Sequence, residues 1–228
     1  MASPPNIYIV GSQCTGKTTL VNAICRHFFD HGTGRAPEDH RPGVIKEVAR
    51  SVLEKHKFVR SDIRDSQSRA LELQKLIIEA QYESERAHLN KYKQSWFISD
   101  RSAVDPVIYA RKYASAAAAD ALCTSEKWLE MKSRMSRSVI VVCEASVEWL
   151  VDDGVRLMPL DPDEWLQLHG EFCAALADMG LEYHVLPGNV GDMDERVEFV
   201  LSRWKEKKAQ LLLQVAGDAD YMRNEHGR

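Results

Sequence analysis

Residues 11–18 carry the clearest chemical signal in the sequence. They read Gly-Ser-Gln-Cys-Thr-Gly-Lys-Thr and match the pattern GxxxxGK[ST] without a gap. The two glycines allow backbone conformations that a Cβ would forbid, so successive N–H groups can turn toward phosphate oxygens. Lys17 brings a positive charge to the β- and γ-phosphates, and Thr18 offers a hydroxyl to Mg²⁺. The spacing therefore predicts a phosphate-binding loop (P-loop) for a nucleoside triphosphate and its magnesium ion.

The expected nucleotide contacts extend into the helix that begins beside Lys17, because a helix N-terminus carries the positive end of the helix dipole. The predicted contacts are Gly11, Ser12, Gln13, Cys14, Thr15, Gly16, Lys17, Thr18 and Thr19. No Asn/Thr-Lys-x-Asp guanine motif occurs in the sequence, which favours ATP over GTP as the nucleotide.

Two carboxylates are candidates for the chemistry next to the phosphates. Asp100 directly follows the apolar segment Trp96–Ser99 and could bind Mg²⁺ or take a proton from an acceptor hydroxyl. Its alternative role is to cap the following helix. Glu47 lies at the end of another apolar segment and is a second candidate base or hydroxyl-binding residue. The sequence leaves the choice between these two carboxylates open.

Two arginines are candidates for stabilising the transferred phosphoryl group. Arg101, beside Asp100, would reach phosphates or a substrate, and the alternative is a surface ion pair of little energetic value. Arg156 follows Asp152-Asp-Gly-Val and could close over the phosphates as part of a mobile loop. Asp-Gly is also a common plain turn, which is the alternative for this segment.

Short apolar segments predict the strands that position these residues. They cover residues 6–10, 44–48, 95–99, 138–145 and 182–186, although residues 44–48 could equally open a helix. The P-loop, Glu47 and Asp100 all lie at the ends of such segments. In a doubly wound parallel sheet these ends meet at one crevice, so we expect the candidate residues to lie close together.

Amphipathic segments between the strands predict the helices. Leu20, Ile24 and Phe28 share one helix face, residues 62–92 read as one long helix, and residues 105–137 are helical with Leu122, Trp128, Leu129 and Met131 facing the core. A further helix begins after Asp161 and ends at Gly180, and a last one covers residues 192–215 before a polar tail at about 216–228. This alternation predicts a single α/β domain over residues 1–228, with a mostly parallel sheet covered on both faces.

Composition and charge exclude several other classes. The formal net charge of −4 gives no overall electrostatic footprint for nucleic acid. No apolar run approaches the roughly 20 residues that span a bilayer, and no secretory signal is expected. Five cysteines without a CxxC pair indicate reduced thiols, so we expect a cytoplasmic protein, with the nucleus as the alternative compartment.

The motifs together resemble a known family. The segments GSQCTGKTTL, VIKEVAR, FISDRS, DPVIYA and DDGVR occur in the order seen in NadR-type AAA domains, the ribosylnicotinamide-kinase-like P-loop domains. The resemblance covers residues 6–205, and the Asp-Arg-Ser also resembles the Glu/Asp-Arg motif of deoxynucleoside and thymidylate kinases. It implies a P-loop NTPase fold with a five-stranded parallel sheet in the order 2-3-1-4-5 and a lid between strands 4 and 5. In that arrangement Lys17 and Thr18 serve ATP and Mg²⁺, Asp100 or Glu47 faces the acceptor, and Arg156 is the lid arginine.

Two functions remain open at this point. The first is a small-molecule kinase that transfers the γ-phosphoryl group of ATP to the hydroxyl of an acceptor such as a nucleoside. The second is a nucleotide-dependent switch or adaptor that hydrolyses ATP or GTP slowly and binds a protein partner, since the resembling group includes binding and trafficking factors. A homodimer is also open, and the polar stretch 30–43 departs from the family pattern in a way that could reshape an acceptor pocket.

Overall fold

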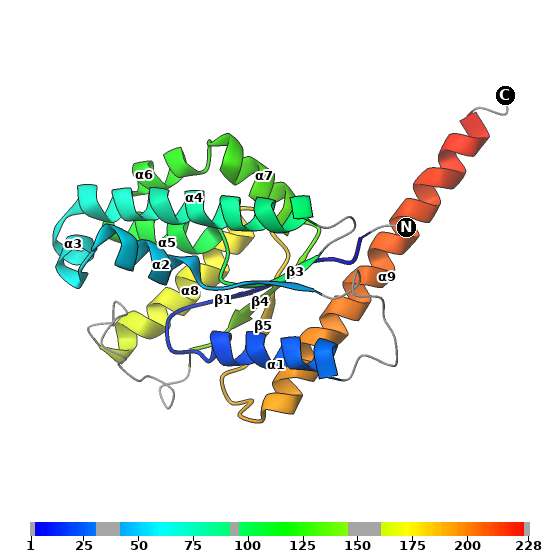
Figure 1. Cartoon of the computed structure of the whole chain (residues 1–228), viewed down its shortest axis with the longest axis horizontal. Helices are drawn as coiled ribbons and strands as arrows, with labels where there is room; N and C mark the ends of the chain where they lie inside the picture. Colours follow the sequence, from blue (N-terminus) through cyan, green and yellow to red (C-terminus); the bar gives the residue numbers. More distant parts are fainter. Residues whose placement is uncertain (1–2, 31–41, 92–95, 146–160, 226–228) are drawn as a thin grey trace.

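The computed structural model describes residues 3–30, 42–91, 96–145 and 161–225, in which strands and helices alternate (Figure 1). The strands are β1 (Ile7–Val10), β2 (Gly43–Ile45), β3 (Phe97–Asp100), β4 (Val139–Cys143) and β5 (His184–Leu186). The helices are α1 (Lys17–Asp30), α2 (Val48–His56), α3 (Arg60–Asp65), α4 (Gln67–Lys91), α5 (Val104–Tyr113), α6 (Ala116–Leu122), α7 (Glu126–Met135), α8 (Pro162–Asp178) and α9 (Met193–Glu225).

The five strands form one parallel sheet in the order β2-β3-β1-β4-β5. This confirms the predicted P-loop NTPase topology. In the middle of the sheet, Ile9 of β1 pairs with Asp100 of β3 on one side and with Val141 of β4 on the other. Residues 44–48 were expected to form either a strand or the start of a helix, and they take part in both. Strand β2 ends at Ile45, and helix α2 begins at Val48. The predicted lid between β4 and β5 falls on residues 146–160, which lie outside the described residues.

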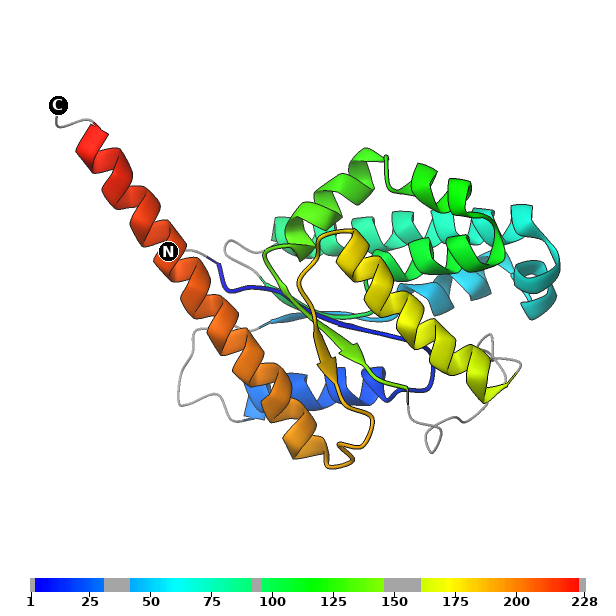
Figure 2. The ribbon, with the colours of Figure 1, turned by 180° about the vertical axis from the view of Figure 1, so that it is seen from behind.

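Alternating side chains of β1 supply the two cores on either side of the sheet. Tyr8 and Val10 belong to a cluster with residues of α4, α5, α7 and α8, whereas Ile7 and Ile9 belong to a cluster with α1 and α9. Figures 1 and 2 show these two helical layers from opposite sides. Every β1 side chain is fully buried, as expected for a strand covered on both faces.

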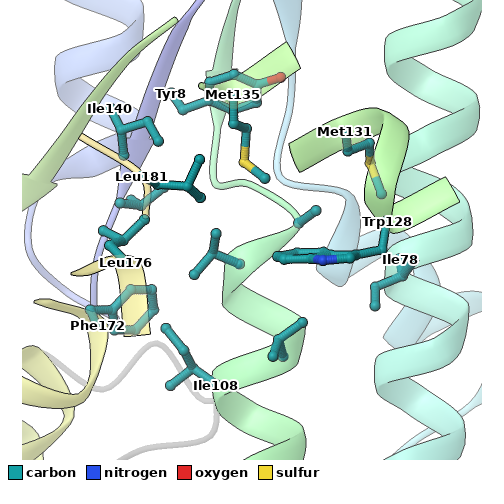
Figure 3. Packing of buried hydrophobic residues seen from close by; sticks show 14 of the residues in the cluster. Tyr8, Ile78, Ile108, Trp128, Met131, Met135, Ile140, Phe172, Leu176 and Leu181 are labelled. Atoms are coloured by element: carbon teal, nitrogen blue, oxygen red, sulfur yellow. The ribbon is translucent and has the colours of Figure 1, made fainter. Parts of the chain in front are cut away.

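The larger core is built around aromatic and methionine side chains of the helices (Figure 3). Trp128, Met131 and Met135 lie on one face of α7 and are at most 1% exposed. The prediction that Leu129 also faces this core is wrong, because its side chain is 53% exposed. Residues 128, 131 and 135 follow the helical period of 3.6, and position 129 points about 100° away from residue 128.

The expected single helix over residues 62–92 is interrupted at Ser66. This residue adopts an extended conformation with φ −134° and ψ 103°. Its hydroxyl accepts a hydrogen bond from Arg69 N at 3.4 Å, and its carbonyl accepts one from Ala70 N at 2.8 Å. Ser66 therefore caps α4. Serine is favoured at the N-cap of a helix and disfavoured in its interior. The periodicity hid this break because Ile63 and Leu73 still reach the same apolar cluster.

The last helix is longer than expected and continues ten residues past Val215. Its first half covers the sheet, and Trp204 Nε1 donates to Pro5 O at 2.8 Å. Its second half extends away from the body of the molecule (Figure 2). Leu212 lies in this second half and is 48% exposed, because α9 has left the sheet at that point. Among the described helices, none combines the length and hydropathy that crossing a membrane requires.

Candidate functional site

The P-loop connects β1 to α1 and contains three residues with positive φ. These are Gly11 at 128°, Cys14 at 59° and Gly16 at 76°. A Cβ at Gly11 would lie 2.8 Å from Cys143 O on the neighbouring strand, so this position requires glycine for space as well as conformation. The predicted roles of both glycines in shaping the loop follow from this geometry.

Lys17 lies inside the loop and is only 5% exposed. Its ammonium group donates to Ser12 O and to Thr15 Oγ1, the latter at 3.2 Å. Burial lowers the pKa of Lys17 to about 8, and repulsion from Arg101 adds to this shift. A bound polyphosphate would favour the charged form of this amine and draw it toward the phosphates.

Thr18 and Asp100 meet at the carboxyl ends of β1 and β3. Thr18 Oγ1 donates to Asp100 Oδ2 at 2.5 Å. Asp100 Oδ1 is buried and forms no hydrogen bond with any described residue. A hydroxyl and a carboxylate oxygen with spare acceptor capacity fit the oxygen ligands that Mg²⁺ prefers. These two residues could therefore hold the ion directly or through water.

Asp105, in the first turn of α5, holds the turn that leads into this helix, and no side chain of the described residues caps α5. It accepts hydrogen bonds from Ser102 N at 2.9 Å and from Ser102 Oγ at 3.0 Å, just before α5 begins. The Asp100 carboxylate points instead to Thr18. The pKa of Asp105 is raised because burial outweighs the attraction of Arg101 and Lys17.

Arg101 joins two carboxylates in a buried ion-pair network. Its Nε donates to Glu47 Oε1 at 2.6 Å, and its Nη1 donates to Asp105 Oδ1 at 3.0 Å. Arg50 Nε donates to the other oxygen of Glu47 at 3.0 Å. Burial opposes ionisation of Glu47, but the two arginines prevail and lower its pKa to about 2. The Arg101 ion pair is thus buried, whereas the sequence alternative had placed it on the surface.

A cavity of about 710 Å³ opens beside the P-loop. Gln13 of the P-loop lines it together with Glu47 and Arg101, and α2, α3, α4 and α5 form its walls. Most of its lining is apolar; the apolar contributors are Val48, Ala49, Leu53, Phe58, Val59, Ile63, Leu73, Ile77 and Pro106. Its volume falls in the range of pockets that enclose small molecules.

Polar side chains enter this cavity at separate points. Tyr109 OH donates to Gln13 Oε1 at 3.0 Å. Gln81 donates to Glu85 Oε1 at 2.8 Å and to Ser99 Oγ at 3.1 Å, so its orientation is fixed. Gln74 also lines the cavity and is 3% exposed. An enclosed amide of this kind can donate to and accept from a ligand.

The structure brings most of the predicted residues together. The P-loop, Asp100, Glu47 and Arg101 all lie at the carboxyl edge of the sheet, whereas Arg156 lies outside the described residues. Thr19 is exposed at the start of α1.

Sequence reasoning missed several residues of the site. Trp165 and Arg196 contact the P-loop from α8 and α9, and no local pattern marked them. Asp105 opens the segment DPVIYA that carries part of the family resemblance, but its ion pair with Arg101 had no helical signal, because Arg101 lies outside α5 with φ 80°. Gln74 had no signal, because glutamine is an ordinary residue on an amphipathic helix.

Comparisons with known proteins agree with this architecture. The structure of NadR in complex with NR superposes with a TM-score of 0.60 at 22% identity over 83% of this chain. NadR in complex with NAD and AMP-PNP gives 0.59 at 17% identity over 86% of this chain. Deoxyadenosine kinase from M. mycoides with bound dATP gives 0.57 at 12% identity, over 88% of this chain and 99% of that enzyme. At these identities the similarity establishes the fold.

The chain spans about half the length of NadR, at 47% and 48% of the two structures. No curated protein matches the chain by sequence. A family model described as AAA domain matches residues 6–196, which include the P-loop, Glu47, Asp100 and most of the sheet's helical cover. The chain therefore belongs to this AAA domain family and has the fold of the P-loop kinases.

Proposed function

We propose that the protein is an ATP-dependent kinase that phosphorylates a hydroxyl group of a small molecule bound in the cavity beside the P-loop. The observation that carries the proposal is the cavity itself, which adjoins the P-loop at Gln13 and contains the Glu47 carboxylate. A protein that only binds and hydrolyses nucleotide has no need for a second pocket next to the P-loop.

The nucleotide half of the site rests on the P-loop. Residues 11–19 would hold the phosphates of ATP, and Lys17 would neutralise the charge that develops between the β- and γ-phosphates. Thr18 and Asp100 would hold Mg²⁺, which supplies charge neutralisation and alignment of the phosphates when it is bound. Arg156 stays a candidate lid arginine.

Glu47 and Asp100 divide the two roles that the sequence left open. Asp100 contacts Thr18 on the metal side, whereas Glu47 lines the cavity. We therefore assign the acceptor hydroxyl to Glu47 and the magnesium ion to Asp100. The acceptor oxygen forms a bond to the γ-phosphorus as the bond to the leaving β-phosphate oxygen breaks, giving ADP and a phosphate ester, and the hydroxyl proton passes late in the step to the Glu47 carboxylate and from there to solvent.

The low pKa of Glu47 is compatible with this assignment. A carboxylate with a pKa of about 2 is a weak base, but it stays ionised and can accept a hydrogen bond from the acceptor hydroxyl. Phosphoryl transfer through a loose transition state removes the acceptor proton late, so alignment of the hydroxyl matters more than basicity. Arg50 and Arg101 fix the carboxylate in place for that purpose.

The lining of the cavity supports an acceptor with a flat or apolar body and a polar edge. Phe58, Ile77 and Pro106 offer apolar contact surface, and the amide of Gln74 offers N–H donors and a carbonyl acceptor. A nucleoside combines these features with free hydroxyl groups. We therefore propose a nucleoside-like acceptor.

The test is ATP consumption by the purified protein with Mg²⁺ against a panel of nucleosides, nicotinamide riboside and simpler alcohols. We expect one class of acceptor to raise the rate well above the rate with water alone. Tight nucleotide binding with slow hydrolysis that no acceptor accelerates would reject the kinase and favour a nucleotide-dependent switch. Gln74→Leu should then separate the sites, raising KM for the acceptor about tenfold while KM for ATP stays within twofold.

A further inference from the structure

Three backbone carbonyl groups of the P-loop are held by side chains from distant parts of the chain. Trp165 Nε1 donates to Gln13 O at 2.8 Å, and Arg196 Nη2 donates to Thr15 O at 3.2 Å. A longer bond of 3.4 Å joins Arg101 Nη1 to Gly11 O. The three carbonyl groups belong to every second residue of the loop, namely Gly11, Gln13 and Thr15.

Trp165 reaches the P-loop from the first turn of α8. Its side chain is fully buried and shares a small apolar cluster with Cys14 and Ala145. Asp161 fixes the start of this helix, since its carboxylate accepts a hydrogen bond from Glu164 N at 2.8 Å. The indole is therefore held by its helix and by packing as well as by its hydrogen bond.

Arg196 reaches the P-loop from the first turn of α9. Its side chain is 1% exposed, and besides Thr15 O it donates through Nη1 to Val190 O at 3.1 Å. One guanidinium group thereby joins the P-loop to the loop between β5 and α9. Arg196 and Thr15 are 181 positions apart in the sequence.

These anchors determine where the neighbouring N–H groups point. In a trans peptide group the carbonyl of one residue and the N–H of the next point in opposite directions, and the described peptide bonds are all trans. Anchoring Gln13 O and Thr15 O therefore turns the N–H groups of Cys14 and Gly16 away from α8 and α9. The N–H groups of Ser12, Thr15 and Gly16 donate to no acceptor within the described residues.

We propose that Trp165 and Arg196 are positioning residues for nucleotide binding, which hold the P-loop peptide groups in the orientation that receives phosphate oxygens. Neither side chain needs to touch the nucleotide. Their effect is to fix the donors before binding, so that less conformational freedom is lost when the phosphates arrive. The proposal rests on nucleotide binding at the P-loop and is independent of which acceptor is phosphorylated.

The decisive variant is Trp165→Phe, which removes the indole donor and keeps an aromatic ring. Trp204→Phe is its matched control, because Trp204 Nε1 also donates to a backbone carbonyl at 2.8 Å but that carbonyl belongs to Pro5. Dissociation constants for MgATP and for inorganic tripolyphosphate are measured by calorimetry on the full chain, together with Tm. Tripolyphosphate isolates the phosphate contacts from those of the nucleoside.

We expect Trp165→Phe to weaken both ligands threefold to tenfold, roughly the effect of one lost hydrogen bond, while Trp204→Phe keeps wild-type affinity. Arg196→Lys should weaken them similarly, because an ammonium group cannot span Thr15 O and Val190 O as the guanidinium does. Unchanged affinity in folded Trp165→Phe, or an equal loss in Trp204→Phe, would overturn the proposal. A wild-type protein that binds MgATP but phosphorylates nothing would reject the kinase and leave this test intact.

Discussion

At the scale of single residues, the P-loop was the part of the site that the sequence could predict. Its pattern is local, and each residue type answers a requirement of phosphate binding. Glu47 and Asp100 could be nominated from strand ends, but their division between cavity and metal needed coordinates. Trp165 and Arg196 could not be found, because their roles arise from tertiary contacts with backbone groups.

Lys17 makes nucleotide affinity depend on pH. Its pKa of about 8 without nucleotide should rise when phosphates bind, so binding takes up a proton between the two pKa values. This group leaves the affinity unchanged below pH 8, and the affinity falls by up to about tenfold per pH unit above it. Calorimetry in buffers of different ionisation enthalpy measures the uptake directly. Binding at pH 9 without proton uptake would contradict the assignment.

Asp100→Asn separates metal binding from nucleotide binding. Asparagine keeps a hydrogen-bonding oxygen for Thr18 Oγ1 but loses the negative charge. We expect the variant to bind ATP without Mg²⁺ about as well as the wild type and to lose most of the affinity gained from Mg²⁺. Titration of ATP with and without Mg²⁺ checks this. Equal loss under both conditions would mark Asp100 as structural.

At the scale of elements, the strands could be predicted better than the helix boundaries. Buried strands leave short apolar segments, and all five observed strands fall within or next to the predicted ones. The break between α3 and α4 was missed because the apolar stripe continues across it, from Ile63 to Leu73. The boundary between the two helices lies at the capping residue Ser66. In the sequence, this serine cannot be distinguished from other serines in a polar segment.

Ser66→Ala measures the energy of that cap. Loss of the hydroxyl removes the acceptor for Arg69 N, so we expect a destabilisation of about 1 kcal/mol. Urea unfolding followed by circular dichroism gives the value. Ser136→Ala is the control, because that exposed hydroxyl donates only to Ser133 O at the end of α7. Similar values for both variants would show that Ser66 does not act as a cap.

At the scale of the whole molecule, the order of the sheet follows from the family resemblance and was confirmed in full. The extent of α9 could not be foreseen, since its second half covers no part of the sheet. Its exposed side chains include Leu213 at 74% and Val215 at 48%. At Leu213 and Val215, tertiary packing therefore adds little to the stability of the helix.

Truncation after Lys208 tests whether that half of α9 contributes to the domain. The contact between Trp204 and Pro5 is retained, so we expect stability within about 0.5 kcal/mol of the full chain and unchanged affinity for MgATP. Urea unfolding and calorimetry of the shortened chain provide both values. A loss of more than 2 kcal/mol would show that the distal helix is part of the folded core.

The central claim is that the cavity beside the P-loop delivers a hydroxyl group to Glu47, and Glu47→Gln tests it most directly. With the acceptor found in the panel, we expect acceptor-dependent ATP consumption to fall about 100-fold or more, because a neutral amide loses the ion pairs with Arg50 and Arg101 that align the side chain and cannot take up the hydroxyl proton, while the Kd for MgATP stays within twofold. Glu54→Gln, which changes another carboxylate lining the same cavity, should keep the wild-type rate. Full activity in Glu47→Gln, or equal losses in the two variants, would contradict the account.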